Sequence, residues 1–347
     1  MTSAAPLCDR LATLVAYLRE HKGIAHKRDI DGVLRALGTP ALPGADAWLG
    51  DDCAAIERGE SDQRGHLLFA IEGFINEFVA HDPWFAGWCG VMVNLSDIAA
   101  MGGRPLAVVD ALWSNGHEQA QAVMAGMAAA AQAFGVPIVG GHSNTRSAQL
   151  QLAVAVLGEA GPLLSSFAAR PGDKLVAAID LRGAYREPFD NWNAATSAPP
   201  ARLRADLALL PAIAEAGQAH AAKDISQAGL LGTTLMLMEC SGVGARVALD
   251  RIPRPEGIAL ERWLRSFPSF GYLLACRPEQ ADALVERFRA RDIGAAVIGD
   301  ITQGSRLELS LADGECTAHA LFWDLAQDRL MGVAPAASRC GEACHAG

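Results

Sequence analysis

The sequence lacks three features that would direct it to nucleic acid, to a membrane or to secretion. It has no Lys/Arg-rich run and a net charge of -10, which argues against nucleic acid or an anionic membrane as the main partner, because both favour a basic face. No apolar run reaches the roughly 18 residues that span a bilayer, and the amino terminus lacks a basic-then-apolar signal pattern. We therefore expect a cytoplasmic protein that binds small molecules or other proteins.

Paired cysteine spacing is also missing. Eight cysteines are scattered along the chain, which in a protein of this size indicates reduced, mostly buried thiols. Cys340, Cys344 and His345 could bind a metal or form a disulfide, but they lie in a tail rich in Gly and Ala. We interpret this group as accidental.

Charged residues are few: they make up 20% of the chain, whereas 51% of its residues are hydrophobic. With 347 residues, the chain can therefore bury a large core, and its length favours two domains over one. A turn signature at 170–173 precedes an apolar strand, which indicates a boundary near 160–170. The expected parts are a helix and arm at 1–45, domains at 46–160 and 165–330, and a flexible tail at 331–347.

Periodicity predicts an amphipathic helix at 8–20 that caps the body of the protein, and an Ala-rich helix at 117–134 that ends at Gly135. Apolar runs predict buried strands. The main predicted strands are 66–71, 105–112, 136–139, 150–157, 174–179, 245–249, 272–276, 294–299 and 306–311.

The stretch from Asn94 to Gly103 carries the strongest functional signal. Leu95, Ile98 and Gly102 recur at helical spacing, and Asp97 lies in the neighbouring row, so a carboxylate falls on the edge of a largely buried helix. Such a group needs a partner. It is either satisfied by backbone amides at a helix start or is a ligand.

Four other acidic residues also allow both a structural and a ligand interpretation. Asp51 and Asp52 are either a solvated turn or a cation site, Glu72 is a strand-end charge or a ligand, and Asp224 is a helix N-cap or a ligand. Oxygen ligands from several segments are what Mg²⁺ prefers.

Two further segments leave alternatives open. The glycines of Gly140-Gly141-His142 form either a tight turn or a loop that approaches a phosphate or metal closely. The run His26–Asp29 is either a solvated turn or a basic arm that folds over an anionic ligand.

Taken together, five segments occur in the order and spacing of the aminoimidazole-ribonucleotide (AIR) synthetase superfamily, which the sequence resembles over roughly 45–330. The superfamily includes thiamine-monophosphate kinase, selenophosphate synthetase, the hydrogenase-maturation carbamoyl dehydratase and formylglycinamidine-ribonucleotide synthetase. Within it, the chain looks most like the AIR synthase-related branch. The five segments are Gly50-Asp51-Asp52-Cys53-Ala54, Asn94-Leu95-Ser96-Asp97-Ile98-Ala99-Ala100-Met101-Gly102, Gly140-Gly141-His142, Gly172-Asp173 and Asp224-Ile225-Ser226.

The resemblance implies a two-domain α+β fold, in which each α/β half has a sheet with helices on one face. It also implies a homodimer whose first domains share a β-barrel, with ATP and Mg²⁺ between the halves. The metal ligands would be Asp52, Glu72, Asp97 and Asp224, of which Asp97 and Asp224 would also be catalytic. The residues that support the metal or bind the nucleotide would be Asp51, Asn94, Gly140, Gly141 and His142.

The sequence departs from individual branches. The kinase-like branch has Asp at the positions of Glu72 and His142, although His142 matches the selenophosphate branch. Thiamine-monophosphate kinase differs at 226–229 and 267–272, and selenophosphate synthetase has a reactive Cys or selenocysteine with a nearby Lys in a glycine-rich segment, a context that Cys8 and Lys27 lack. These differences argue against both activities.

The leading hypothesis is Mg²⁺- and ATP-dependent phosphoryl transfer to an oxygen of a small-molecule substrate, in a kinase or a synthetase. The differences at Glu72 and His142 motivate an alternative, a nucleotide-binding regulatory or scaffold subunit without turnover. A third hypothesis is a metal-dependent hydrolase.

Overall fold

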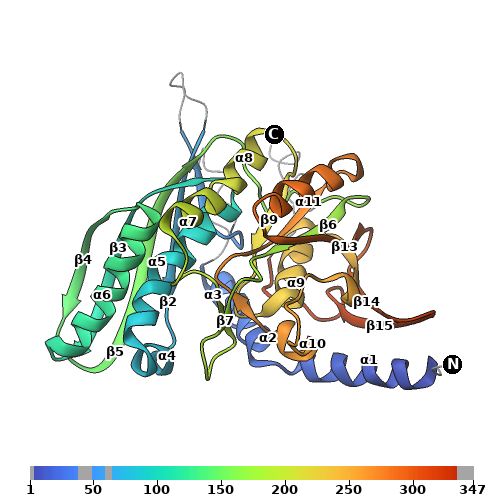
Figure 1. Ribbon diagram of the computed structural model, residues 1–347, viewed down its shortest axis with the longest axis horizontal. Helices are drawn as coiled ribbons and strands as arrows, with labels where there is room; N and C mark the ends of the chain where they lie inside the picture. The colour runs from blue at the N-terminus through green and yellow to red at the C-terminus, as the bar shows by residue number, and fades with distance from the viewer. Residues whose placement is uncertain (1–3, 38–48, 59–64, 334–347) are drawn as a thin grey trace.

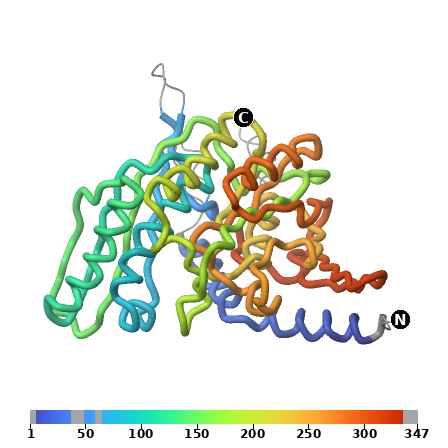
Figure 2. The backbone as a smooth tube through the Cα atoms, in the orientation of Figure 1, coloured from blue at the N-terminus to red at the C-terminus, as the bar shows by residue number. Residues whose placement is uncertain are grey.

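The computed structural model describes residues 4–37, 49–58 and 65–333. Two groups of residues lie outside the described ones: Pro40, Pro43 and Gly44, whose residue types predict a loop, and Cys340, Cys344 and His345. Among the helices described, none has the length and apolarity needed to cross a membrane. The chain forms two domains, each built on its own sheet, which lie side by side in Figures 1 and 2.

The first domain contains a five-stranded sheet in the order β1-β2-β5-β3-β4. Neighbouring strands are antiparallel except β3 and β4, which are parallel and are joined by a crossover through α6. The bounds are β1 Ala54–Glu57, β2 His66–Gly73, β3 Arg104–Asn115, α6 His117–Phe134, β4 Ile138–Asn144 and β5 Arg146–Ala160.

Helices α5 (Pro83–Ala100) and α6 cover one face of this sheet (Figure 1). The two helices pack closely through glycines: a Cβ atom on Gly87 would lie 2.0 Å from the Val123 carbonyl oxygen, and one on Gly126 would lie 1.8 Å from that of Trp84. This close packing buries nearly the whole of α5. The carboxyl end of α5 is thereby held in the interior of the protein.

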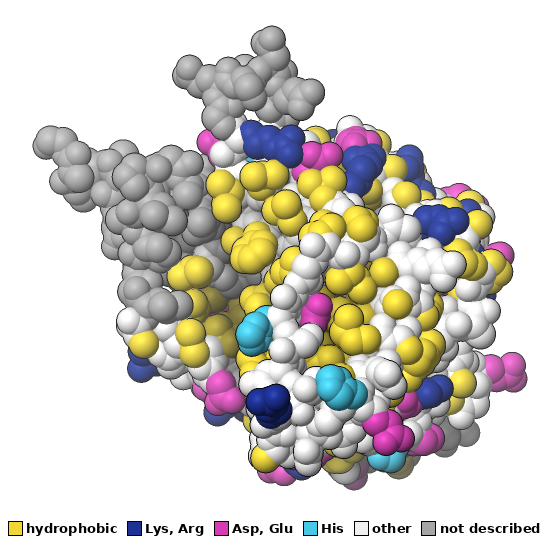
Figure 3. Space-filling view, turned by 90° about the vertical axis from the view of Figure 1, so that its left-hand side faces the viewer, with side chains coloured by type: hydrophobic (Ala, Val, Ile, Leu, Met, Phe, Trp, Pro, Cys, Tyr) yellow, Lys and Arg dark blue, Asp and Glu magenta, His cyan; other side chains and the backbone are white. Residues whose placement is uncertain are grey.

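The other face of the first sheet carries exposed apolar side chains. Ile71 and Val139 are each 64% exposed, and hydrophobic side chains gather over this part of the molecule in Figure 3. Isolated apolar residues are common on protein surfaces, but a contiguous patch marks an interaction site. The other exposed apolar residues of these strands are Ile56, Phe69, Leu106, Val109 and Leu157.

The second domain contains a mixed seven-stranded sheet in the order β15-β14-β10-β13-β6-β12-β9, and both of its faces are buried. Leu175 and Ala177 of β6 pack into the cluster that includes α1 and α9, whereas Val176 and Ala178 pack against α8 and α11. The expectation of helices on one face therefore holds for the first domain and is wrong for the second. The bounds are β6 Lys174–Ile179, β9 Ala221–Asp224, β10 Gly244–Ala248, β12 Gly271–Cys276, β13 Gly294–Thr302, β14 Arg306–Asp313, β15 Cys316–Asp324, α1 Ala4–Arg19, α8 Leu209–Glu215, α9 Gly229–Ser241 and α11 Ala281–Arg289.

Shorter elements connect these layers. Strands β7 and β8 join β11 in a three-stranded sheet of order β11-β8-β7, and two helices, α7 and α8, follow β8 in the chain. The remaining bounds are α2 Lys22–Lys27, α3 Asp29–Leu37, α4 Asn76–His81, β7 Ala184–Tyr185, β8 Asn191–Asn193, α7 Pro200–Leu207, η1 Leu249–Arg251, α10 Leu260–Trp263, β11 Phe267–Pro268 and η2 Pro278–Gln280.

The helix predicted at 8–20 is confirmed as α1, which packs on β14 and β15 through Leu11, Leu14 and Leu18. Strand β15 was not predicted. Cys53, Cys89, Cys240 and Cys276 are free thiols and are buried, as expected.

Candidate metal and nucleotide site

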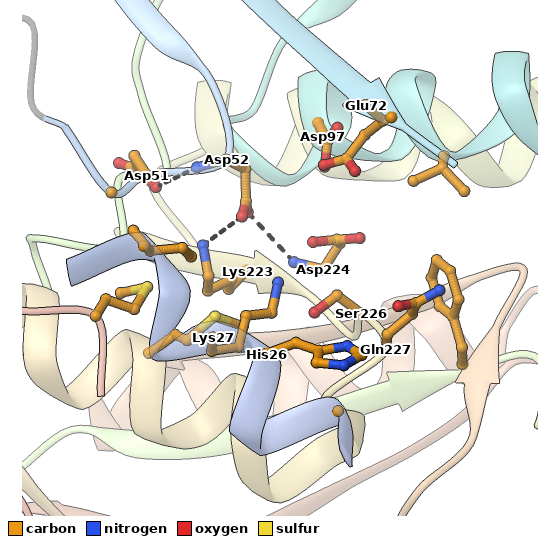
Figure 4. Close-up of a pocket in the computed structure, with 18 of the residues that line it drawn as sticks. His26, Lys27, Asp51, Asp52, Glu72, Asp97, Lys223, Asp224, Ser226 and Gln227 are labelled. Carbon is orange, nitrogen blue, oxygen red and sulfur yellow. Dashed lines mark hydrogen bonds and ion pairs between the residues drawn. The ribbon is translucent and has the colours of Figure 1, made fainter. Parts of the chain in front are cut away.

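A cavity of about 410 Å³ lies between the two domains. Its walls come from β2 and α5 of the first domain, from the segment after β9 in the second, and from α2 and α3 of the amino-terminal arm. The polar residues that line the cavity come from these different elements and are labelled in Figure 4: His26, Lys27, Asp51, Asp52, Glu72, Asp97, Lys223, Asp224, Ser226 and Gln227.

Asp97 lies in the last turn of α5, which ends at Ala100. The interpretation that backbone amides at a helix start satisfy this carboxylate is therefore wrong, because the free amides of a helix are at its other end. Asp97 is 5% exposed, and its Oδ2 atom is buried without a hydrogen-bond partner in the described structure. A buried, unpartnered carboxylate oxygen requires a proton or a cation.

Asp224 is the last residue of strand β9 and is 5% exposed. The alternative that it caps the following helix is wrong, because α9 begins at Gly229 and its N-cap residue is Ala228. Asp224 instead faces Asp97 and Asp52, and one carboxylate oxygen from each of these three residues lies within 4.8 Å of the others. Three oxygens this close suit a single divalent cation.

Asp51 and Asp52 occupy the bend after Gly50, whose φ of 111° requires glycine. Asp51 is held within the protein: its Oδ2 accepts a hydrogen bond of 2.6 Å from the Ser165 hydroxyl, and its carboxylate accepts the Ser166 amide at 3.1 Å. Asp52 forms an ion pair with Lys223 through Oδ1, and its Oδ2 lies 3.4 Å from the Asp224 amide nitrogen. Asp51 therefore supports the bend, while Asp52 reaches the cluster.

Glu72 is the second-last residue of β2 and points toward Asp97 in Figure 4. It lines the cavity but is the most exposed of the four acids, and it is outside the group of three that approach within 4.8 Å.

The site is electrostatically unfavourable without a cation. Burial raises the pKa of Asp52 to about 7 and that of Asp224 to about 6, and the Lys223 ammonium moderates both effects. Burial, followed by the charges of Asp224 and Glu72, raises the pKa of Asp97 well above its usual value. The pKa of Glu72 is also raised, mainly by desolvation. Divalent cations would relieve this repulsion, so the residues fit Mg²⁺.

The His26–Asp29 segment is not a solvated turn. His26 and Lys27 end helix α2, and both side chains line the cavity. The helix is seated closely, because a Cβ atom on Gly23 would lie only 2.2 Å from the Gln227 carbonyl oxygen. Lys27 follows Gly23 by one helical turn and so faces the same way. The arm therefore brings a cation to the acids, as the second alternative requires.

Two domain models of known proteins match this chain: the N-terminal domain of AIR synthase related protein at residues 50–160, and its C-terminal domain at residues 181–312. The chain is also 45% identical over 329 residues to the Uncharacterized protein sll0787 of Synechocystis, which covers 93% of this chain and 98% of that protein. The chain belongs to the AIR synthase-related family. The resemblance stated from the motifs is thus confirmed.

Other proteins resemble this AIR synthase-related chain over shorter spans or at lower identity. Uncharacterized protein MJ0640 of Methanocaldococcus jannaschii is 35% identical over 235 residues, covering 67% of this chain and 72% of that protein. T. maritima PurL complexed with AMPPCP has a TM-score of 0.69 at 21% identity, covering 93% of this chain and 51% of PurL. The chain thus spans about half of PurL, and this likeness shows the fold alone.

Several predicted residues of the AIR synthase-related chain do not reach the cavity. Asn94 is fully buried one turn before Asp97, and its Nδ2 donates to the Gly90 carbonyl oxygen at 2.8 Å. Gly140, Gly141 and His142 lie in strand β4, not in a loop, and β4 forms the edge of the first sheet remote from β1 and β2. None of these four lines the cavity of the single chain.

Two contributions to the site were missed. Lys223 precedes Asp224 within an otherwise apolar strand, and a lysine in a buried strand is itself an unusual signal. Met331 lines the cavity, and its backbone amide donates to the buried Glu239 carboxylate at 2.7 Å. The start of the segment expected to be a flexible tail is thus packed: Met331 and Val333 are 2% exposed.

Proposed function

We propose that this protein is an enzyme that uses ATP and Mg²⁺ to transfer a phosphoryl group to an oxygen of a small-molecule substrate. The observation that carries the proposal is the convergence of Asp52, Asp97 and Asp224, three carboxylates from separate segments, on one cavity between the domains. The PurM-like superfamily to which the family belongs contains ATP-dependent enzymes, which supports this choice.

In this proposal Asp52, Asp97 and Asp224 hold Mg²⁺, and Glu72 joins them from the cavity wall. The metal, when bound, would neutralise phosphate charge that grows or shifts during transfer. Lys27 reaches into the same space and forms no ion pair with a described residue, so its ammonium is available to a phosphate oxygen. The protein would mainly align the reacting groups.

The cavity also has an apolar side. Phe74 and Val93 come from the first domain and Phe267 from the second. Such a wall accommodates the apolar part of a nucleotide or acceptor and limits access of water to the transferred group. The acceptor is expected to be a small molecule that combines an apolar body with a reactive oxygen.

A coupled assay of ADP release tests this function against its two rivals. We expect ADP release that needs Mg²⁺ and a small-molecule acceptor, and that is lost in Asp224→Asn. ATP binding without turnover on any acceptor would favour the regulatory or scaffold subunit, because Glu72 and the remote His142 would then mark a site that binds but does not react. Phosphate release at full rate without an acceptor would favour a metal-dependent hydrolase.

We also propose that the protein is a homodimer formed through the exposed apolar face of the first sheet, with the two sheets contributing to a shared barrel. The face carries Ile71 and Val139, and a second copy would remove both from water. Light scattering should give twice the monomer mass, and Ile71→Lys with Val139→Lys should give monomers. Leu321→Lys, at a 46% exposed position on β15 of the second domain, is the control. A monomeric wild-type protein at all concentrations would contradict the dimer.

A further inference from the structure

Lys223 is the most deeply buried cation of the site. It lies in strand β9, is 4% exposed, and pairs through Nζ with Asp52 Oδ1 (Figure 4). Removing an ammonium group from water is costly unless a counter-charge is close. The pair is thus fixed: Lys223 holds the Asp52 carboxylate in one orientation, and Asp52 holds the ammonium in the interior.

This pair divides the acids of the cavity into two sets. Asp51 and Asp52 find their partners inside the protein, namely Ser165, Ser166 and Lys223. Asp97, Asp224 and Glu72 form no ion pair with any residue in the described part of the chain, and Asp97 Oδ2 has no partner of any kind there. The need for an added cation is therefore concentrated in the second set.

The geometry leaves room for one divalent ion beside Asp97 and Asp224, but not for another at the Asp51–Asp52 end. One oxygen each of Asp52, Asp97 and Asp224 lies within 4.8 Å of the others, which suits one ion. A second ion at the Asp51–Asp52 end would meet the ammonium of Lys223, and two cations so close together repel. Asp52 can still share its second oxygen with the first ion, because the contact of that oxygen with the Asp224 amide is long, at 3.4 Å.

We propose that Lys223 is a positioning residue that takes the place of a second metal ion at the Asp51–Asp52 end. The nucleotide-free protein then binds one divalent cation, through Asp97, Asp224 and the shared oxygen of Asp52. This inference rests on the proposed metal-dependent function. It adds that the protein binds one ion in the absence of nucleotide, and that Lys223 is the residue that prevents a second from binding.

The test is Mn²⁺ binding to the nucleotide-free protein at neutral pH, followed by electron paramagnetic resonance and by thermal melting. We expect one tightly bound ion in the wild type and one more in Lys223→Met, because the variant lacks the ammonium that pairs with Asp52 and offsets the nearby charge of Asp51. Lys223→Met should melt lower than the wild type without metal and gain more from Mn²⁺. Lys174→Met is the matched control, because Lys174 forms a surface pair with Asp300 and should change neither quantity.

A Lys223→Met protein with the stoichiometry and Mn²⁺ stabilisation of the wild type would overturn the inference while leaving the proposed function intact. A wild type that binds no Mn²⁺ would overturn both. If Lys223→Met does not fold, Asp52→Asn is compared with Asp52→Asn/Lys223→Met. The double variant should bind Mn²⁺ more tightly than the single one, because it lacks the unpaired ammonium. Equal or weaker binding would also overturn the inference.

Discussion

Two groups of buried acids in this protein have opposite surroundings. Asp180 and Asp206 are 3% and 4% exposed, as deeply buried as Asp97 and Asp224 at 5%. Arginines surround the first pair: Arg182 Nε lies 2.8 Å from Asp180, and Arg291 Nε lies 2.6 Å from Asp206. No arginine or lysine pairs with Asp97 or Asp224 among the described residues.

The difference separates a structural charge cluster from a binding site. The arginine-paired acids tie the end of β6 to α7 and to the segment after α11, and the protein itself neutralises them. Asp97 and Asp224 at the cavity have no such partner among the described residues, so in the proposed function a bound cation would supply the missing charge and would stabilise the fold. Burial alone therefore does not point to a metal site, whereas burial without a counter-ion is the feature on which the proposed site rests.

The largest effect is expected for Asp206→Asn, which breaks the paired cluster. Loss of this charge leaves Arg291 and Arg182 without one of their partners, and breaking a buried ion pair costs on the order of 3 kcal/mol. Urea denaturation should show this loss equally with and without Mg²⁺-ATP. A loss that Mg²⁺-ATP repairs would mean that the two clusters are not distinct.

The pH dependence of stability should differ between the clusters. The folded pKa values of Asp52, at about 7, and of Asp224, at about 6, are raised above the usual 3.8. Between the usual pKa and the raised pKa of each group, the folded state therefore binds more protons than the unfolded state. The associated stability is fully present below about pH 4 and is lost as pH rises through about 6 to about 7.

Urea denaturation in EDTA from about pH 5 to about pH 8 measures this loss. Asp224→Asn should flatten the decline, and Asp206→Asn should keep it, because Asp206 has arginine partners. Saturating Mg²⁺ should also remove the decline, since the bound cation favours the charged carboxylates. Stability that rises with pH in EDTA would contradict the unfavourable charge at the cavity.

The smallest effect is expected for Lys27→Met at the cavity. Its ammonium has no described ion-pair partner, so the variant should keep its melting temperature. Affinity for Mg²⁺-ATP should fall about tenfold, or about 1.4 kcal/mol. Titration calorimetry measures this affinity. The control is Lys22→Met, because Lys22 lies at the exposed start of the same helix. Unchanged affinity in Lys27→Met would show that the arm does not touch the nucleotide.

The sequence identified the acids better than it identified their surroundings. The Asn94–Gly103 string predicted that Asp97 lies at a buried helical position, and the structure places it there because α5 packs on α6 through glycines. Asp224 was found through its motif, yet its place at the end of a strand was not, since a short apolar strand and a helix start look alike in sequence. The strand predicted at 136–139 is confirmed in part, because β4 continues to Asn144; its residues from Gly140 were taken for a turn or loop because of the two glycines.

Long-range contacts account for the rest. Nothing local shows that Lys223 pairs with Asp52, which lies far away in the chain. The docking of α2 depends on the fit of Gly23 against the Gln227 carbonyl, and the packing of Met331 depends on Glu239. Such contacts join segments that only the folded chain brings together.

The central claim is that Asp97 is a metal ligand, and Asp97→Asn tests it most directly. Thermal melts compare this variant with the wild type, each with and without Mg²⁺-ATP. Removing one charge from an unpaired acidic cluster should leave the metal-free protein as stable as the wild type or more so, and should sharply reduce the stabilisation by Mg²⁺-ATP. An Asp97→Asn protein that keeps the full stabilisation of the wild type by Mg²⁺-ATP would contradict the metal site.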